Sequence, residues 1–316
     1  MPRDKDDDTA AFVSEVCWNY YVNGMTQAEI GAAMGTTRLR VNQAIQRAKA
    51  SGMVRIQIES PFLSRMEMQV ALAEKLGIQQ AIVAPANRQN YDYHQSVGAA
   101  LASYLTQAAE SGRFRRIGVS WGMTLQSAVS NLPRLDRADV EVISMIGGTT
   151  KGATFNSFSI ASGLAERFGA NWSLLAAPIF LSEEIDRDAF LSQEIFREHF
   201  SKFEALDAAV LTASDISDRS YLISACLPTE KHAKRLTEAG AIGDVVGRFL
   251  DRDGQSVAND LDARTVGVSL ETLSAVPEKI LAAAGPHKVE VIRAVARRGL
   301  ATTLITDDVT AELLLG

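Results

Sequence analysis

Residues 26–58 read TQAEIGAAMGTTRLRVNQAIQRAKASGMVRIQI, and this stretch decides how the N-terminal part of the chain folds. Thr26 and Glu29 have the spacing of a capping box, in which the threonine hydroxyl accepts from the backbone N–H of the third helical residue. Gly35 can turn the chain at a positive φ without a Cβ penalty. We therefore expect a short helix that ends at Gly35 and a second helix from about Arg38 to Ser51.

The second of these helices has one apolar stripe and one polar face. Its apolar residues recur at i, i+3, i+4 and i+7, so they point inward; they are Val41, Ala44, Ile45 and Ala48. Arg40, Gln43 and Arg47 lie on the opposite side, and such side chains hydrogen-bond base edges or phosphates in the major groove. A helix over Thr9–Val22 precedes this pair, and residues 53–59 alternate as a strand would.

These elements together predict a winged helix-turn-helix that binds double-stranded DNA. The candidate DNA-binding residues are Gln27, Thr36, Thr37, Arg38, Arg40, Asn42, Gln43 and Arg47. Gly31 is small enough for the two helices to cross closely. The alternative is a three-helix module that binds another protein.

Charge divides the chain in the same place. The whole chain carries −6, but residues 26–55 hold five cations against Glu29 alone, a net +4 that leaves −10 for the rest. A small basic module on an acidic body is typical of a protein with one part that meets phosphates. We therefore expect a DNA-binding domain over residues 1–60 and a second, acidic domain with a different role over 61–316.

Residues 62–77 are predicted to form a helix that links the two domains. Its apolar residues are spaced three to four apart; they are Leu63, Met66, Val70, Ala73 and Leu76. This stripe suits either the core of the same chain or pairing with the same helix of a second subunit. The sequence leaves both interpretations open.

Composition excludes several classes of protein. A chain of 316 residues has room for about two domains. No apolar run reaches the length of a membrane span, and the acidic start MPRDKDDD does not resemble a targeting signal. Cys17 and Cys226 lie far apart without ligand spacing, so a zinc site or other metal site is not expected. The sequence predicts a cytoplasmic protein without membrane contact.

Beyond residue 80, short apolar runs alternate with helical stretches. The expected strands are 81–84, 117–120, 140–146, 173–177, 208–211, 266–269, 280–284 and 303–306. Buried strands separated by helices predict a three-layer α/β, Rossmann-like domain with a mainly parallel sheet. Ligands of such domains bind beyond the carboxyl ends of the strands.

Two glycine- and hydroxyl-rich loops follow predicted strands. Ser120–Thr124 comes first, and Gly147–Gly152 comes second and includes a lysine. Such loops present N–H groups and hydroxyls to an anion or to sugar hydroxyls. A polyol, a sugar or a sugar phosphate is therefore the expected ligand class.

Two enzyme motifs are relevant to the loops that follow the strands. Gly118, Ser120 and Gly122 match the nucleophile elbow of α/β-hydrolases, but no HGGG-like oxyanion loop precedes them, which disfavours hydrolysis. No Gly-x-Gly-x-x-Gly joins a strand to a helix, so no dinucleotide cofactor is expected. His94, His199 and His232 are expected to be surface or packing residues.

The chain resembles the SorC family of sugar-responsive bacterial transcription regulators over essentially its whole length. The segments that carry the resemblance are GMTQAEIGAAMGTTRLRVNQAI, GVSWGMTL, IGGTTKGATFN, GAIGDVVGRFLDRDG, TVGVSLETL and HKVEVIRAVARRGLATTLITDDVTAELLL. The resemblance implies a regulator, expected to be a repressor, of a carbohydrate or polyol catabolic operon. It also implies an effector domain similar to glucosamine-6-phosphate deaminases and ribose-5-phosphate isomerases, and assembly as a dimer of dimers.

The resemblance also implies an effector site. Its residues would be Ser120, Gly122, Thr124, Gly148, Thr149, Thr150, Asn156, Asp244, Lys288 and Asp307. Trp121, beside the first loop, is either a stacking surface for a polyol carbon chain or a core residue. Many members have two glycines where this chain has Gly285-Pro286, which removes a backbone N–H donor, and both phosphorylated and unphosphorylated ligands fit the remaining residues. The rival interpretation is a phosphosugar isomerase or deaminase, with Asp244 or Asp307 as the base beside Lys288.

Overall fold

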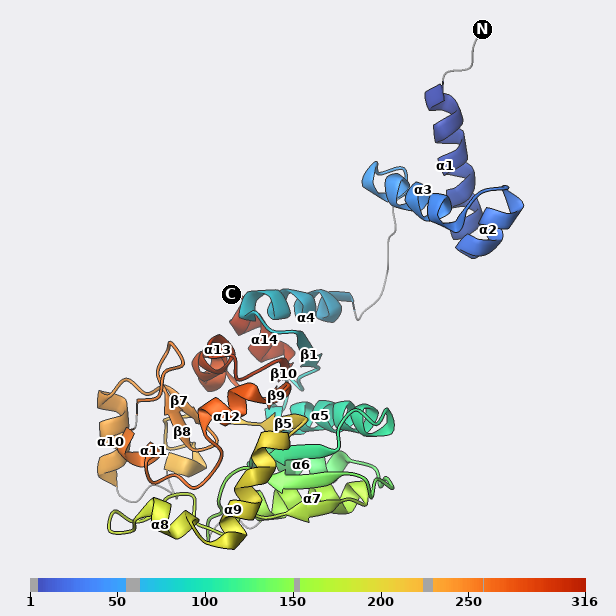
Figure 1. Cartoon of the computed structure of the whole chain (residues 1–316). Coiled ribbons are helices and arrows are strands. Elements are labelled where there is room, and N and C mark those ends of the chain that lie inside the picture. The colour runs from blue at the N-terminus through green and yellow to red at the C-terminus, as the bar shows by residue number, and fades with distance from the viewer. Residues whose placement is uncertain (1–4, 55–62, 151–153, 224–229, 258) are drawn as a thin grey trace. The chain divides into compact units, whose positions relative to one another are not determined.

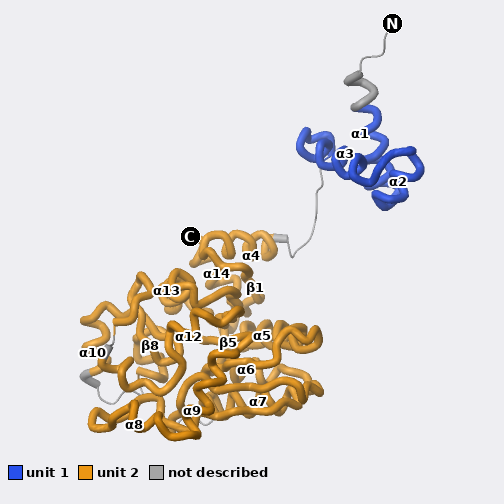
Figure 2. The backbone as a smooth tube through the Cα atoms, viewed as in Figure 1, with its two compact units in different colours: residues 1–63 blue, residues 64–316 orange. Residues whose placement is uncertain are grey.

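The computed structural model describes residues 5–54, 63–150, 154–223, 230–257 and 259–316. The chain divides into two compact units, Met1–Leu63 and Ser64–Gly316 (Figure 1, Figure 2). The sequence places this division at residue 60. Each unit has its own hydrophobic core.

The first unit consists of helices α1 (Lys5–Tyr21), α2 (Gln27–Ala33) and α3 (Arg38–Ala50). The capping box forms as the spacing predicts, because Thr26 accepts from Glu29 N and the Glu29 carboxylate accepts from Thr26 N at 2.7 Å. Gly35 turns the chain at φ +61°. All four predicted inward residues of α3 are buried. The predicted wing falls mostly on residues 55–62, outside the described residues.

The second unit is built on a seven-stranded sheet in which every pairing is parallel. The strand order is β1-β10-β9-β5-β2-β3-β4. The strands are β1 (Gln80–Ala84), β2 (Arg116–Val119), β3 (Glu141–Ser144), β4 (Asn171–Ser173), β5 (Ala208–Leu211), β9 (Glu278–Ala282) and β10 (Thr303–Asp307). The predicted α/β class with a parallel sheet is confirmed.

Helices cover both faces of this sheet, which makes three layers. On one face, α5 (Tyr93–Glu110), α6 (Met123–Asn131) and α7 (Ser157–Phe168) share a core with residues such as Val119 and Val210. The alternate residues of the same strands, such as Ala209 and Leu211, point to the other face and its own core. The elements toward that side include α9 (Glu194–Ser201), η1 (Lys202–Ala205), α12 (Leu270–Ala275), α13 (Val289–Arg297) and α14 (Asp308–Leu315).

A small antiparallel sheet lies beside the main one, and the sequence did not predict it. Its strands are β6 (Ala213–Asp215), β7 (Gly243–Val245) and β8 (Arg248–Leu250). The remaining helices are α8 (Arg187–Leu191), α10 (Glu230–Glu238), α11 (Asn259–Asp262) and η3 (Pro286–Lys288). Among the helices of the described residues, none is long and apolar enough to cross a membrane.

Two predicted strands are wrong in detail. Residues 266–269 form no strand of the main sheet, because Gly267 makes an isolated bridge to Ile146 and Ser269 already caps α12. The strand expected at 173–177 ends at Ser173, because the N–H of Leu175 donates to the Ser144 side chain rather than continuing a strand ladder.

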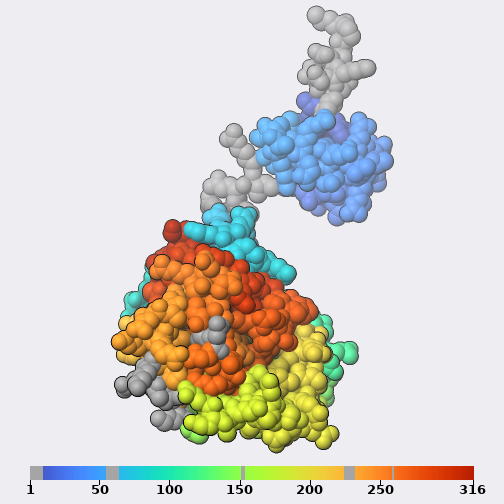
Figure 3. Space-filling model, turned by 60° about the vertical axis from the view of Figure 1, so that its left-hand side comes forward, coloured from blue at the N-terminus to red at the C-terminus, as the bar shows by residue number. Residues whose placement is uncertain are grey.

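The linker helix is present as α4 (Leu63–Leu76), but its buried side differs from the predicted stripe. Leu72 is buried and Met68 and Leu76 pack beside it, whereas Met66 and Val70 are each 60% exposed. Lys75 Nζ donates to the Leu315 carbonyl at 2.5 Å, which ties α4 to the C-terminal segment (Figure 1, Figure 3). The intramolecular interpretation of the stripe is therefore wrong for Met66 and Val70.

Candidate functional site

Helix α3 presents most of the predicted DNA-binding residues to solvent. Thr37 caps the helix by accepting from Arg40 N at 3.3 Å. The exposed members are Thr37, Arg38, Arg40, Gln43 and Arg47, and the half-buried ones are Gln27, Thr36 and Asn42. The half-buried Gln27 and Asn42 side chains hydrogen-bond each other at 3.5 Å, which connects α2 to α3.

Two contacts shape this surface. A Cβ on Gly31 would lie 2.9 Å from the Thr36 carbonyl oxygen, so the crossing of α2 and the turn requires glycine. The Arg40 guanidinium lies over the Phe12 ring, 4.8 Å from its centroid, so α1 helps to orient it. Leu39, which is 66% exposed, is an apolar side chain on the same helix that the sequence argument did not select.

The second unit contains a cavity of about 240 Å³ at the carboxyl ends of the strands. It lies where the strand order changes direction, since the chain continues from β2 outward to β3 and β4 and then returns to β5 on the other side of β2. The Thr212 N–H donates to Ser120 Oγ at 3.1 Å, and Thr212 Oγ1 donates to the Trp121 carbonyl at 2.7 Å. These two bonds hold the ends of β2 and β5 together.

The loop between β2 and α6 forms one wall of the cavity. Gly122 caps α6 at φ +118°, a conformation that L side chains rarely adopt, and its N–H donates to the Phe155 carbonyl at 2.9 Å. Thr124 follows, and its hydroxyl contacts His94 Nδ1 at 2.9 Å. Burial lowers the pKa of His94 to about 4, so this imidazole is neutral at pH 7.

Aromatic rings form a second wall. Tyr221 lies edge-on to Trp121 and to Phe155, with ring centroids 5.9 and 4.8 Å away. The Tyr221 hydroxyl is buried without a hydrogen-bond partner among the described residues. Flat rings beside an unpaired hydroxyl suit a ligand that carries both C–H faces and hydroxyl groups.

Asp244 supplies the buried carboxylate of the cavity. It accepts from the Ser214 hydroxyl and from Gly247 N at 3.1 Å. Burial raises the pKa of Asp244 to about 6, although both hydrogen bonds oppose this shift. Val246 and Gly247 join β7 to β8 with φ +48° and +75°, so Asp244 braces a turn that holds a β-branched residue in a strained conformation.

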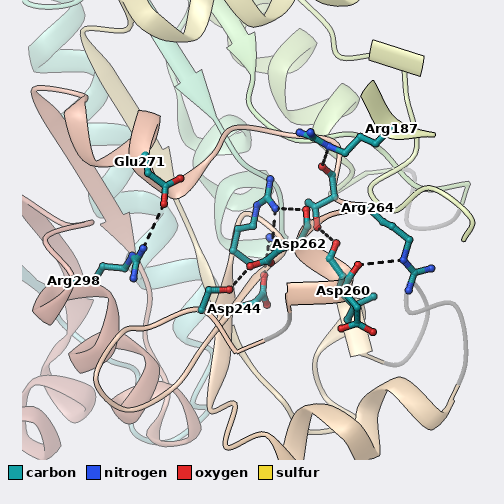
Figure 4. A network of polar contacts seen from close by, with 12 residues as sticks. Arg187, Asp244, Asp260, Asp262, Arg264, Glu271 and Arg298 are labelled. Atoms are coloured by element: carbon teal, nitrogen blue, oxygen red, sulfur yellow. Dashed lines mark hydrogen bonds and ion pairs between the residues drawn. The ribbon is translucent and has the colours of Figure 1, made fainter. Parts of the chain in front are cut away.

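Behind this turn lies a buried ion pair. Arg248 Nη1 donates to the Asp262 carbonyl at 2.6 Å and lies 3.8 Å from its carboxylate, which also accepts from Ser256. Figure 4 draws Asp244, Asp262 and the neighbouring pair Arg298–Glu271, 3.8 Å apart. The GD-x-x-GRF segment thus places one carboxylate in the cavity and anchors the hairpin that carries it.

Lys288 enters the cavity from η3, after β9. Its Nζ lies 5.3 Å from the centroid of the Tyr93 ring. Burial lowers the pKa of Lys288 to about 8, and the negative charges of Asp215 and Asp244 only partly oppose this shift. Tyr93 also contacts His287, with the hydroxyl 3.4 Å from Nε2.

The structure brings five of the predicted effector residues to the cavity wall. These are Trp121, Gly122, Thr124, Asp244 and Lys288. Ser120 lies just behind the wall, where its hydroxyl is used by Thr212. Because Ser120 is fully buried and already accepts this bond, the nucleophile-elbow interpretation is wrong.

The other predicted effector residues do not line the cavity among the described residues. They are Gly148, Thr149, Thr150, Asn156 and Asp307. Gly148 N donates to the Ala177 carbonyl, and Asn156 caps α7 while its Nδ2 donates to the Thr149 carbonyl. Asp307 caps α14 by accepting from Thr310 N at 2.7 Å. Lys151 lies outside the described residues.

Several lining residues escaped the sequence argument. They are Tyr93, His94, Phe155, Thr212, Ala213, Ser214, Arg219, Ser220, Tyr221 and Leu222. The expectation that His94 is a surface or packing residue is wrong, because its ring lines the cavity and contacts Thr124. Ligands of such domains bind beyond the carboxyl ends of the strands, and this rule could have found Thr212, which directly follows β5, and Ser214 in β6.

The family model Sugar-bind, described as "Putative sugar-binding domain", matches residues 60–316. The chain belongs to this sugar-binding family. The full-length Sorbitol Operon Regulator SorC from Klebsiella pneumoniae has a crystal structure that aligns with a TM-score of 0.74 at 25% identity, covering 98% of this chain and 100% of that one. The resemblance to the SorC family is confirmed.

Curated relatives agree with this family. The Erythritol catabolism regulatory protein EryD of Brucella abortus (strain 2308) is 27% identical over 314 residues, 99% of this chain and 98% of that protein. Transcriptional regulator LsrR of Escherichia coli (strain K12) is 24% identical over 311 residues, 96% of this chain and 94% of that protein. These relatives are transcriptional regulators rather than enzymes, and the present chain is a transcriptional regulator with a sugar-binding C-terminal domain.

Proposed function

We propose that the first unit binds double-stranded operator DNA, with α3 in the major groove, and that the chain represses a carbohydrate or polyol catabolic operon in the cytoplasm. The exposed row of Arg40, Gln43 and Arg47 supports this proposal, because these groups hydrogen-bond base edges and phosphates. Arg38 and Thr37 stand at the start of α3, where contacts to the phosphate backbone fix the register of a recognition helix.

The effector in this proposal is a sugar, a polyol or a sugar phosphate bound in the cavity at the strand ends. The single observation that carries it is the meeting of Lys288, Asp244 and unpaired Tyr221 hydroxyl within about 240 Å³. At ~30 Å³ per water molecule this volume holds about eight waters, enough for a monosaccharide-sized ligand. Trp121 offers a flat face for C–H groups.

Oligomerisation completes the proposal. We place one dimer contact on α4, where Met66 and Val70 are exposed one helical turn apart, and expect the dimers to pair into a tetramer. A ligand changes operator affinity only through different affinities for the DNA-competent and DNA-incompetent arrangements of such an assembly.

Operator binding in the presence of candidate effectors tests this function. The operator is sought in the chain's own upstream region by mobility shift, and erythritol, sorbitol, short aldoses and their phosphates are then added. We expect one class to weaken the complex by 5–150-fold, roughly the range of ordinary allosteric coupling. Failure to shift any fragment would contradict DNA binding, and indifference to every sugar and polyol would contradict the effector role.

A further inference from the structure

Lys288 is a buried amine without a hydrogen-bond acceptor among the described residues. Its side chain lines the cavity, and the whole residue is only 8% exposed. Its Nζ lies 5.3 Å from the centroid of the Tyr93 ring, and Asp215 and Asp244 are near enough to act on its charge. A buried lysine with a purely structural role would be expected to donate hydrogen bonds to nearby carbonyls or carboxylates.

A second buried lysine of the same unit shows that difference. Lys279 is 6% exposed, and its Nζ donates to the Ser274 carbonyl at 3.0 Å and to the Val276 carbonyl at 2.8 Å. Little of either lysine is exposed to solvent, although Lys288 lies deeper among protein atoms than Lys279. Only Lys288 aims an unengaged nitrogen at an open space.

Burial also makes the amine of Lys288 available as a nucleophile. A lysine with a pKa of about 8 carries a fraction of neutral amine at pH 7.5 that is roughly two-hundredfold larger than that of a lysine at its reference pKa. The charged groups that face it from the surrounding elements are Asp215, Asp244 and Arg219, with His94 and His287 as neighbouring imidazoles. Asp244, with a pKa raised to about 6, can take up a proton and return it.

We propose that Lys288 forms a reversible imine with the carbonyl group of an open-chain aldose or ketose that enters the cavity. This inference rests on the proposed effector role of the cavity and goes beyond it, because it adds a covalent step and a carbonyl requirement. An imine commits the ligand to one orientation beside Trp121 and Asp244. A polyol without a carbonyl group binds the same cavity only non-covalently.

The chemistry is balanced without an oxidant or a reductant. The neutral Nζ attacks the carbonyl carbon, an N–C bond forms, and the C=O π electrons move to oxygen. The carboxylate of Asp244 takes one proton from nitrogen and passes it to the new alkoxide, which gives a neutral carbinolamine. The nitrogen lone pair then forms the C=N bond as the C–O bond breaks and hydroxide leaves. Asp244 carries the second nitrogen proton to this hydroxide, so the products are the neutral imine and water.

Reductive trapping on the full-length protein tests the imine. The protein is incubated at pH 7.5 with D-erythrose and cyanoborohydride, digested, and each lysine is measured by peptide mass spectrometry. We expect the reduced adduct on Lys288 in excess over two control lysines. Lys279 is little exposed but donates to two carbonyls, and Lys234 has an 80% exposed side chain that reports adventitious glycation. Erythritol, which has no carbonyl, should compete and reduce the adduct.

A second measurement detects the imine directly, without a reductant that must first reach the buried lysine. D-Erythrose labelled with ¹³C at its carbonyl carbon should give an imine resonance with the wild type and none with Lys288→Arg, which keeps the positive charge but is not nucleophilic. Asp244→Asn should slow the appearance of the resonance. Adduct on exposed lysines alone together with no imine resonance would overturn the proposal.

The outcome separates this inference from the proposed function. If erythritol or erythrose releases operator DNA without any adduct at Lys288, the effector role stands and the imine is wrong. If the adduct forms but operator binding never changes, the imine stands and the regulatory role of the cavity is wrong.

Discussion

Asp244 is the residue at which the stability lost by burying a charged group in the cavity can be measured. Burial raises its pKa from 3.8 to about 6, so between these values the folded protein binds more protons than the unfolded chain. The free energy of unfolding should therefore fall as pH rises from about 4 to 6, by up to about 3 kcal/mol from this group. Asp244→Asn, which has no charge to bury, should lose this part of the decline.

Urea unfolding of the wild type and of Asp244→Asn, at pH 4 and at pH 7, measures the effect. The exposed Asp253, with an 84% exposed side chain, provides the matched control Asp253→Asn, whose pH dependence should follow the wild type. Parallel curves for all three proteins would mean that Asp244 is ionised in the fold without penalty.

Arg47 is the residue on which the DNA interface is best tested. It is exposed near the C-terminal end of α3, outside the buried stripe of that helix. Arg47→Ala should weaken operator binding by ~1–3 kcal/mol if the guanidinium reads a base. Arg134→Ala removes an 81% exposed arginine of the second unit and should leave the affinity unchanged. Mobility shifts that do not distinguish these two variants would show that α3 does not enter the groove.

At the scale of elements, Gly31 controls the angle between α2 and the turn before α3. A methyl group there would lie 2.9 Å from the Thr36 carbonyl oxygen, and the backbone would have to shift at a cost of ~1–3 kcal/mol. The gain in helix propensity is only ~1 kcal/mol. Gly31→Ala should therefore weaken operator binding by mobility shift, whereas the exposed Ala32→Ser should not, and equal affinities would contradict the close crossing.

Elements also show where prediction from sequence succeeds. The capping box at Thr26, the buried stripe of α3 and strands such as β5 follow from local spacing, so the sequence suffices for them. Strands β7 and β8 have three residues each, too few for a periodic signal. They form because the turn at Val246 and Gly247 is braced by Asp244, a contact that depends on tertiary structure.

Some residues of the cavity can likewise be predicted from the sequence, and others cannot. The loops after strands β2 and β9 contain Trp121, Thr124 and Lys288. These residues can be predicted because ligands bind beyond the carboxyl ends of parallel strands. Tyr93 and His94 start a helix that follows β1, whose neighbour in the sheet is β10, and their approach to Lys288 results from the strand order. The Gly147–Thr150 loop has the right composition, but its described part is held by Ala177, Pro178 and Asn156 rather than directed into the cavity.

At the scale of the whole molecule, a repressor that reads a two-fold symmetric operator must present two copies of α3 about one helical turn of DNA apart, ~34–36 Å. The exposed apolar pair on α4, Met66 and Val70, is the surface to which we assign the contact that joins two chains. The double variant Met66→Glu, Val70→Glu places two carboxylates where two apolar side chains would meet their symmetry mates. It should lower the oligomeric state in sedimentation velocity without unfolding the chain, because neither residue belongs to the buried side of α4.

Operator binding should fall together with assembly, since each chain then meets a half-site alone and loses the second set of contacts. Leu313→Glu, at a residue of α14 that is 45% exposed, changes apolar surface to charge elsewhere and should preserve both assembly and binding. An unchanged oligomer in the α4 double variant would place the dimer contact on another surface. A smaller oligomer that still binds the operator with full affinity would instead mean that one chain suffices, and that the effector cannot act by rearranging subunits.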